Sequence, residues 1–131
     1  MKVTVDTNVL VRAVVQDDPV QSLRAAAVLR DASMIAVALP ALCELVWVLR
    51  KVYGFGVADV AQSLRALMAT ANVDMNRPAA AAGLAMLEAG GDFADGVIAH
   101  EGNGLGGETF VSFDKKAVRL LVAQGQSARL L

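Results

Sequence analysis

The chain has 131 residues, a length typical of one compact domain that buries a core without disulfides or a structural metal. Its formal net charge of −1 argues against a coat protein that holds nucleic acid through a generally basic surface. An apolar share of 56 % exceeds that of most soluble domains, so a partner is expected to cover some apolar surface, although much of the excess is alanine.

The cysteine content and the N-terminal residues indicate the compartment. Cys43 is the single cysteine and lies in the apolar stretch LPALCELVWVL, where a buried, reduced thiol is expected. The N-terminal MKVTVDTN lacks the apolar segment of a signal peptide, and no stretch reaches the roughly 18 uncharged apolar residues of a membrane span. These features predict a cytoplasmic protein.

The first half of the chain alternates between strands and helices. The β-branched VTV at 3–5 predicts a short strand, followed directly by a helix over NVLVRAVV. A helix is predicted over 19–30, with a proline in its first turn, and a second strand over MIAVA. A nearly all-apolar helix from Pro40 to about Tyr53, closed by Gly54, and a second helix from Val57 onward predict a helical hairpin.

The second half continues the alternation. Strands are predicted at 73–75 and 109–113, and helices after Pro78, over 93–100 and from Lys115, with SARLL as a closing edge strand. The glycine-rich EGNGLGGE at 101–108 is predicted to be a loop. Because parallel strands need crossover connections, this order predicts an α/β fold with a mostly parallel central sheet and helices on both faces. With no repeat or linker, one domain over 1–131 is expected.

Two aspartates stand where predicted strands end. Asp6 follows the first strand and Asp114 follows the strand at 109–113. Ligands of open parallel sheets bind at the carboxyl ends of the strands, so both residues are candidates for a binding site. Each also has a structural alternative as an N-cap that accepts backbone N–H groups.

Glu44 is an isolated carboxylate in the apolar helix that begins at Pro40. Burying such a charge alone is costly, so a partner from elsewhere in the fold is expected, either a metal ion or an arginine. The alternatives are an edge position that reaches solvent and a buried pair with Arg12.

The segment GGDFADGVIAH supplies two more carboxylates. Asp92 is predicted to be the N-cap of the following helix. Asp95 is either the N3 acid of the same helix or, one turn further in, a residue that points back across the strand ends. If Asp95 converges with the other three candidates, the like charges need a cation. Oxygen ligands favour Mg²⁺ or Mn²⁺, and a single histidine and a single cysteine argue against zinc.

Four segments, DTNVLVR, LPALCELVWVL, DFADGVIAH and SFDKKAVRL, together resemble the successive motifs of PIN domains, and most closely those of the VapC-type toxins of bacterial toxin–antitoxin pairs. The resemblance covers nearly the whole chain and implies a three-layer α/β/α fold. It also implies a metal site and supporting polar residues. The implied ligands are Asp6, Glu44, Asp95 and Asp114, with Thr7, Asn8 and Ser112 supporting them and Asp92 as a companion. Gly96 departs from the alanine usual in the family and is expected to leave the site intact but to loosen its helix.

The resemblance further implies hydrolysis of single-stranded or loop RNA that leaves a 5′ phosphate and a 3′ hydroxyl. It also implies inhibition by a cognate antitoxin protein. Metal-bound carboxylates can activate water and polarise a phosphate without a nucleophilic side chain. A homodimer is expected through the apolar helices at 40–70. The candidate phosphate contacts are Arg12, Lys115, Lys116 and Arg119.

Three other functions are alternatives for a chain with an acid after its first strand. A haloacid-dehalogenase-like phosphatase needs a second acid two residues after Asp6, where Asn8 stands, and a receiver domain usually begins with adjacent acids. A catalytically inactive interaction module would use the acids only as caps and surface charges. His100 is expected to be structural, and Trp47 to belong to the core or an interface.

Overall fold

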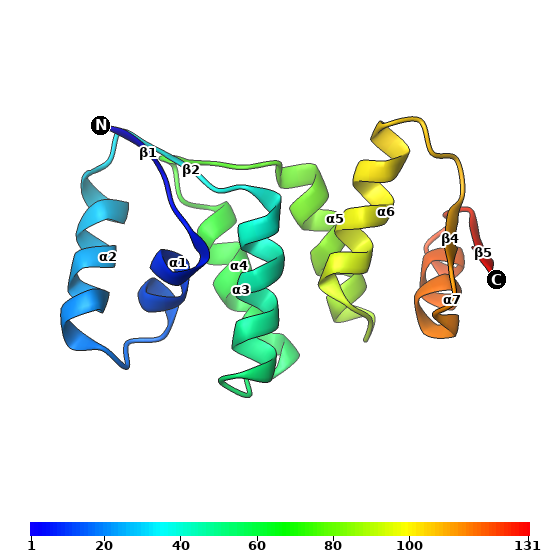
Figure 1. The fold of residues 1–131 in the computed structure, drawn as a ribbon, viewed down its shortest axis with the longest axis horizontal. Coiled ribbons are helices and arrows are strands. Elements are labelled where there is room, and N and C mark those ends of the chain that lie inside the picture. The colour runs from blue at the N-terminus through cyan, green and yellow to red at the C-terminus, as the bar shows by residue number, and fades with distance from the viewer. The chain divides into compact units, whose positions relative to one another are not determined.

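The computed structural model describes residues 1–131, which divide into two compact units, Met1–Asn76 and Arg77–Leu131. The N-terminal unit contains β1 (Lys2–Thr4), α1 (Thr7–Val14), α2 (Pro19–Asp31), β2 (Met34–Ala36), α3 (Leu39–Lys51), α4 (Val57–Met68) and β3 (Val73–Asp74), coloured from blue to green in Figure 1. The C-terminal unit contains α5 (Arg77–Glu88), α6 (Phe93–Gly104), β4 (Phe110–Ser112), α7 (Lys115–Ala123) and β5 (Ala128–Leu130).

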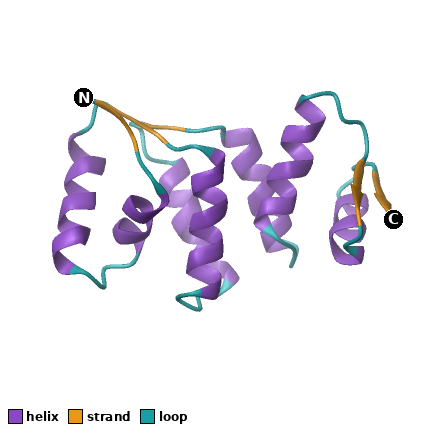
Figure 2. Cartoon of the chain, in the orientation of Figure 1, coloured by secondary structure: helices purple, strands orange, loops and turns teal.

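Every strand pairing is parallel. In the N-terminal unit the strand order is β1-β2-β3, with Val3 opposite Ile35 and Ile35 opposite Val73. In the C-terminal unit β4 pairs with β5, with Phe110 opposite Ala128. The strands are short and are separated by helices (Figure 2), as parallel pairing requires. The α/β class with parallel strands is confirmed, and the pairs form two sheets rather than one.

The core of the N-terminal unit lies between the central strand and the helices. Helix α1 contacts α2 and α3, and α3 contacts α4, which confirms the helical hairpin. Gly54 closes α3 with φ +68°, a conformation that favours glycine. The most deeply buried side chains of this unit are Leu10, Ile35, Leu42, Leu45, Leu49, Val60 and Leu64.

The C-terminal unit is built on the contact between α5 and α6. Alanine, the best helix former, dominates α5, and Pro78 stands in its first turn, where a missing N–H costs nothing. A second cluster joins Met86 of α5, Ala99 of α6 and Leu121 of α7, and Phe110 of β4 packs against it. This cluster connects the helix pair to the C-terminal strands.

One expectation from the sequence is corrected and another is narrowed. Helix α6 continues to Gly104, so the glycine-rich loop begins only at Leu105. The Leu105 N–H donates to the Glu101 carbonyl and keeps the last turn helical despite its glycines. Of the two locations expected for Trp47, the core is ruled out, since 60 % of the residue is exposed on α3, and the interface is not tested. None of the helices combines the length and the apolar character needed to cross a bilayer.

Candidate functional site

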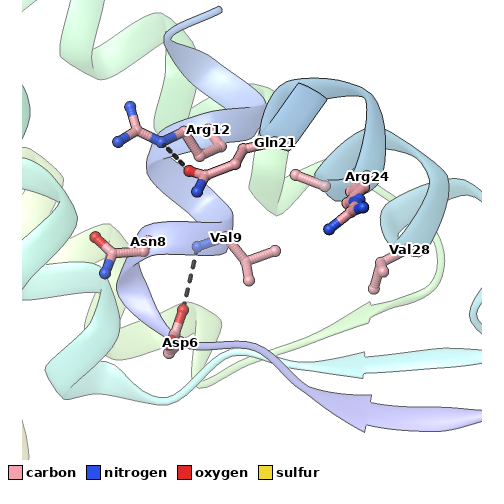
Figure 3. A pocket seen from close by; sticks show the side chains of 8 residues that line it. Asp6, Asn8, Val9, Arg12, Gln21, Arg24 and Val28 are labelled. Atoms are coloured by element: carbon pink, nitrogen blue, oxygen red, sulfur yellow. Dashed lines mark hydrogen bonds between the residues drawn. The ribbon is translucent and has the colours of Figure 1, made fainter. Parts of the chain in front are cut away.

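Asp6 is positioned by the junction between β1 and α1. It is the N-cap of α1, and its Oδ1 accepts the Val9 N–H at 3.2 Å (Figure 3). The capping interpretation is therefore confirmed, but the cap uses only one carboxylate oxygen. The side chain is exposed, so its Oδ2 is available to another ligand.

Glu44 lies on α3, one turn from its start, and is exposed rather than buried. Its Oε2 accepts a hydrogen bond of 3.0 Å from the Thr7 hydroxyl at the start of α1. The expected alternative of a buried pair with Arg12 is wrong, because Glu44 is exposed and Arg12 bonds to other residues. Helix α3 packs against α1 and α4, and Glu44 lies on a part of its surface that these two helices do not cover.

Arg12 belongs to a structural network on the other side of α1. Its Nη1 donates to Asp17 at 2.7 Å and to the Tyr53 hydroxyl at 3.2 Å, and its Nε donates to Gln21 at 2.8 Å. The Tyr53 hydroxyl in turn donates to Asp17 at 3.1 Å. Because Asp17 neutralises its charge, Arg12 is a poor candidate for a phosphate contact.

A hollow of about 310 Å³ lies between α1 and α2, beside Asp6 (Figure 3). Its volume is at the lower end of the range found for ligand pockets. The residues that line it are Asp6, Asn8, Val9, Arg12, Gln21, Arg24, Ala25 and Val28. The sequence interpretation missed Arg24, which gives no signal beyond its helical spacing from Gln21 and Val28.

Three aspartates of the C-terminal unit interact electrostatically. Asp92 caps α6 through the Ala94 N–H at 3.1 Å, as predicted. Asp114 caps α7, and its Oδ1 accepts the N–H groups of Lys116 and Ala117 at 2.9 and 3.1 Å. Burial raises the pKa of Asp95, and the negative charges of Asp92 and Asp114 raise this pKa further.

Ser112 supports the turn that carries Asp114. Its hydroxyl accepts the Asp114 backbone N–H at 2.9 Å, which holds the residue at the end of β4. Both Ser112 and Thr7 therefore contact a predicted site acid or its backbone. Asn8 makes no such contact and instead lines the hollow beside Asp6.

The predicted set of four acids divides equally between the units. Asp6 and Glu44 belong to the N-terminal unit, and Asp95 and Asp114 belong to the C-terminal unit. Neither unit alone gathers three or more metal-ligating side chains. The donor chemistry fits a hard divalent cation, since all donors are carboxylate oxygens and the like-charge repulsion at Asp95 is what a cation relieves.

Gly96 has a packing role that the sequence did not reveal. A Cβ built at this position would lie 2.5 Å from the Ala82 carbonyl oxygen and 2.9 Å from the Gly83 Cα, both of them backbone atoms of α5. At Gly83 a Cβ would lie 2.7 Å from the Phe93 ring of α6. The glycine at position 96 therefore allows α5 and α6 to approach closely, which an alanine would hinder.

Comparison with known protein families decides the family. The model of the PIN domain matches residues 3–120. The chain belongs to the PIN domain family. The match spans both units of this PIN domain protein and includes all four predicted site acids. PIN domains are typically metal-dependent nucleases. A search of curated proteins found no match to the chain.

Proposed function

We propose that this PIN domain protein is a metal-dependent endoribonuclease that acts as the toxin of a toxin–antitoxin pair. The observation that carries the proposal is the family match over residues 3–120, which includes Asp6, Glu44, Asp95 and Asp114. Three of these acids also lie at the starts of helices, Asp6 and Asp114 as N-caps and Asp95 in the first turn of α6.

The proposed cofactor is Mg²⁺ or Mn²⁺, held by the four acids directly or through water. When bound, the ion lowers the pKa of a coordinated water and polarises the scissile phosphate. The caps support this role, because Asp6 and Asp114 each use one oxygen for the backbone and keep the other for a ligand. We assign Asp6 and Asp95 as the main ligands and Glu44 and Asp114 as further ligands.

The protein's own groups then act on the water and the RNA. One of the carboxylates accepts the proton of the attacking water as the water oxygen bonds to phosphorus. The bond from phosphorus to the 3′ oxygen breaks, and that oxygen takes up a proton. The products carry a 5′ phosphate and a 3′ hydroxyl. Lys115, Lys116 and Arg119, which are exposed on the first turns of α7, are the proposed phosphate contacts of the C-terminal unit.

The activity is tested by incubating the purified protein with labelled single-stranded RNA in Mg²⁺, in Mn²⁺ or in EDTA. Internal cleavage that requires the ion and leaves 5′ phosphates is expected. Cleavage that persists in EDTA, or no cleavage by folded, metal-loaded and antitoxin-free protein, would overturn the proposal. The second result would favour the alternative of an inactive interaction module, in which the acids serve only as caps.

The toxin role and the partners rest on the VapC resemblance. Expression of the chain alone in the cytoplasm of a bacterial host is expected to arrest the growth of the cells. Asp6→Asn is expected to relieve the arrest. A cognate antitoxin should restore growth with the wild-type chain. Arrest by the Asp6→Asn variant equal to that by the wild type would contradict a catalytic toxin.

A homodimer through the helices at 40–70 is supported by exposed apolar side chains in this segment. Trp47 is 60 % exposed and Val52 is 63 % exposed. Light scattering at micromolar concentration is expected to give the mass of a dimer, and Trp47→Ser is expected to shift the protein toward monomer. A wild-type monomer would contradict this part of the proposal.

A further inference from the structure

The hollow between α1 and α2 has the features of a small ligand site. The side chains of Val9, Ala25 and Val28 give it an apolar wall, whereas Gln21 and Arg24 of α2 give it polar groups (Figure 3). At about 310 Å³ it has room for a single small unit rather than for a stretch of polymer. An apolar wall with a few polar groups is the usual composition of such sites.

Arg24 is the free cation of this hollow. Of the two arginines that line it, Arg12 is paired with Asp17 at 2.7 Å, whereas Arg24 has no hydrogen-bond or ion-pair partner. Arg30, also on α2, pairs with Asp31 at 2.8 Å and does not line the hollow. The exposed Arg24 guanidinium can therefore engage a ligand without breaking an existing interaction.

A phosphate ligand fits the electrostatics of this surface. The protein carries a net charge of −1, so no general positive field attracts RNA. An RNA phosphate near the Asp6 carboxylate is repelled by its negative charge, and a cation nearby offsets this repulsion. The planar guanidinium group also binds phosphate in a bidentate manner.

We propose that the hollow is a subsite for one nucleotide of the RNA, with the phosphate held by Arg24 and the base placed against Val9, Ala25 and Val28. This inference rests on the proposed ribonuclease function. It makes Arg24 a substrate-binding residue that the sequence motifs do not identify.

The test compares Arg24→Gln with Arg30→Gln, a matched variant on the same helix outside the hollow. Binding of a labelled single-stranded RNA is measured by fluorescence anisotropy at several salt concentrations, with Ca²⁺ in place of Mg²⁺. Loss of one phosphate contact is expected to weaken binding roughly 10-fold. Loss of this contact should also reduce the steepness of the plot of log K, the association constant for RNA, against the logarithm of the salt concentration, by about 0.7. Arg30→Gln should change neither quantity, and Arg24→Lys should restore most of the slope.

The cleavage reaction gives the second readout. With Mg²⁺, Arg24→Gln is expected to raise KM roughly 10-fold with little change in kcat, because its contact acts in binding. Binding and KM equal to those of Arg30→Gln would overturn the inference while leaving the ribonuclease proposal intact. If RNA binding depends on Arg24 but the wild type never cleaves RNA, the inference stands and the proposed activity fails. A wild type that does not bind RNA would overturn the subsite.

Discussion

The Thr7 hydroxyl donates a hydrogen bond of 3.0 Å to Glu44 Oε2, joining the start of α1 to α3 across 37 residues of sequence. Thr7 is the residue directly after Asp6, so the turn that positions Asp6 also positions Glu44. The bond lies at the surface, where it contributes little to stability. Its geometry instead fixes the direction of one carboxylate of the N-terminal unit relative to the other.

Thr7→Val removes this hydrogen bond while keeping the shape of the side chain. The cleavage rate is expected to fall about 10–100-fold, because a ligand acid loses the group that orients it. The free energy of unfolding should change by no more than about 1 kcal/mol, measured by chemical denaturation. Thr7→Ser keeps the hydroxyl and should retain most of the activity. Equal rates for the two variants would exclude a positioning role for Thr7.

The cap and the ligand functions of Asp6 can be separated by two substitutions. Asp6→Asn keeps a side-chain oxygen for the Val9 N–H and should leave stability nearly unchanged, whereas Asp6→Ala should cost about 1 kcal/mol. Both variants should lose cleavage activity. Thermal unfolding of the two proteins measures the difference. An Asn variant as unstable as the Ala variant would show that the charge, rather than the cap, stabilises α1.

Gly96→Ala places a Cβ against the backbone of α5, where flexible side chains cannot absorb the contact. The protein is expected to lose about 1–3 kcal/mol of stability, because the two helices must move apart. Gly102→Ala, a site in the same helix with open space around it, is the control and should not destabilise the protein. A Gly96→Ala protein as stable as the wild type would refute the close approach of α5 and α6.

Asp95 makes the metal-free protein sensitive to pH. Its pKa in the folded state is raised by burial and by the charges of Asp92 and Asp114, so the folded state binds its proton more tightly than the unfolded state does. The free energy of unfolding therefore falls as the pH rises from the unfolded pKa, about 3.9, through the folded pKa.

Asp95→Asn removes the destabilising charge. In EDTA at pH 7 this variant is expected to unfold at a higher temperature than the wild type, and the difference should shrink as the pH is lowered toward about 4. Differential scanning calorimetry across this range gives the comparison. A variant that is less stable than the wild type at pH 7 would contradict the unfavourable charge at Asp95.

The sequence predicted the order of helices and strands because hydrophobic periodicity, β-branched runs and end signals act over a few residues. The Asp92 cap, the Gly54 turn and the parallel pairing follow from such local rules. Contacts between distant segments gave no comparable signal. The partnership of Arg12 with Tyr53 joins residues 41 apart, and the role of Gly96 depends on how closely α5 approaches.

Of the properties of the candidate site, the burial of its side chains was the hardest to predict from the sequence. Glu44 and Trp47 lie in an apolar segment, where burial of either was one of the expected alternatives, and the structure exposes both on α3. The overall apolar composition of a helix does not indicate which of its faces is exposed to solvent. That the Arg24 guanidinium has no ion-pair partner likewise could not be predicted from the sequence, because it depends on which residues surround Arg24 in the fold.

The most direct test of the central claim is the rate of RNA cleavage by four single variants, Asp6→Asn, Glu44→Gln, Asp95→Asn and Asp114→Asn, each verified as folded and assayed with Mg²⁺. If these acids form the metal site, Asp6→Asn and Asp95→Asn should each lower the rate on the order of 100-fold or more. Glu44→Gln and Asp114→Asn should lower it by a smaller factor. A wild-type rate in Asp6→Asn or Asp95→Asn would contradict the account.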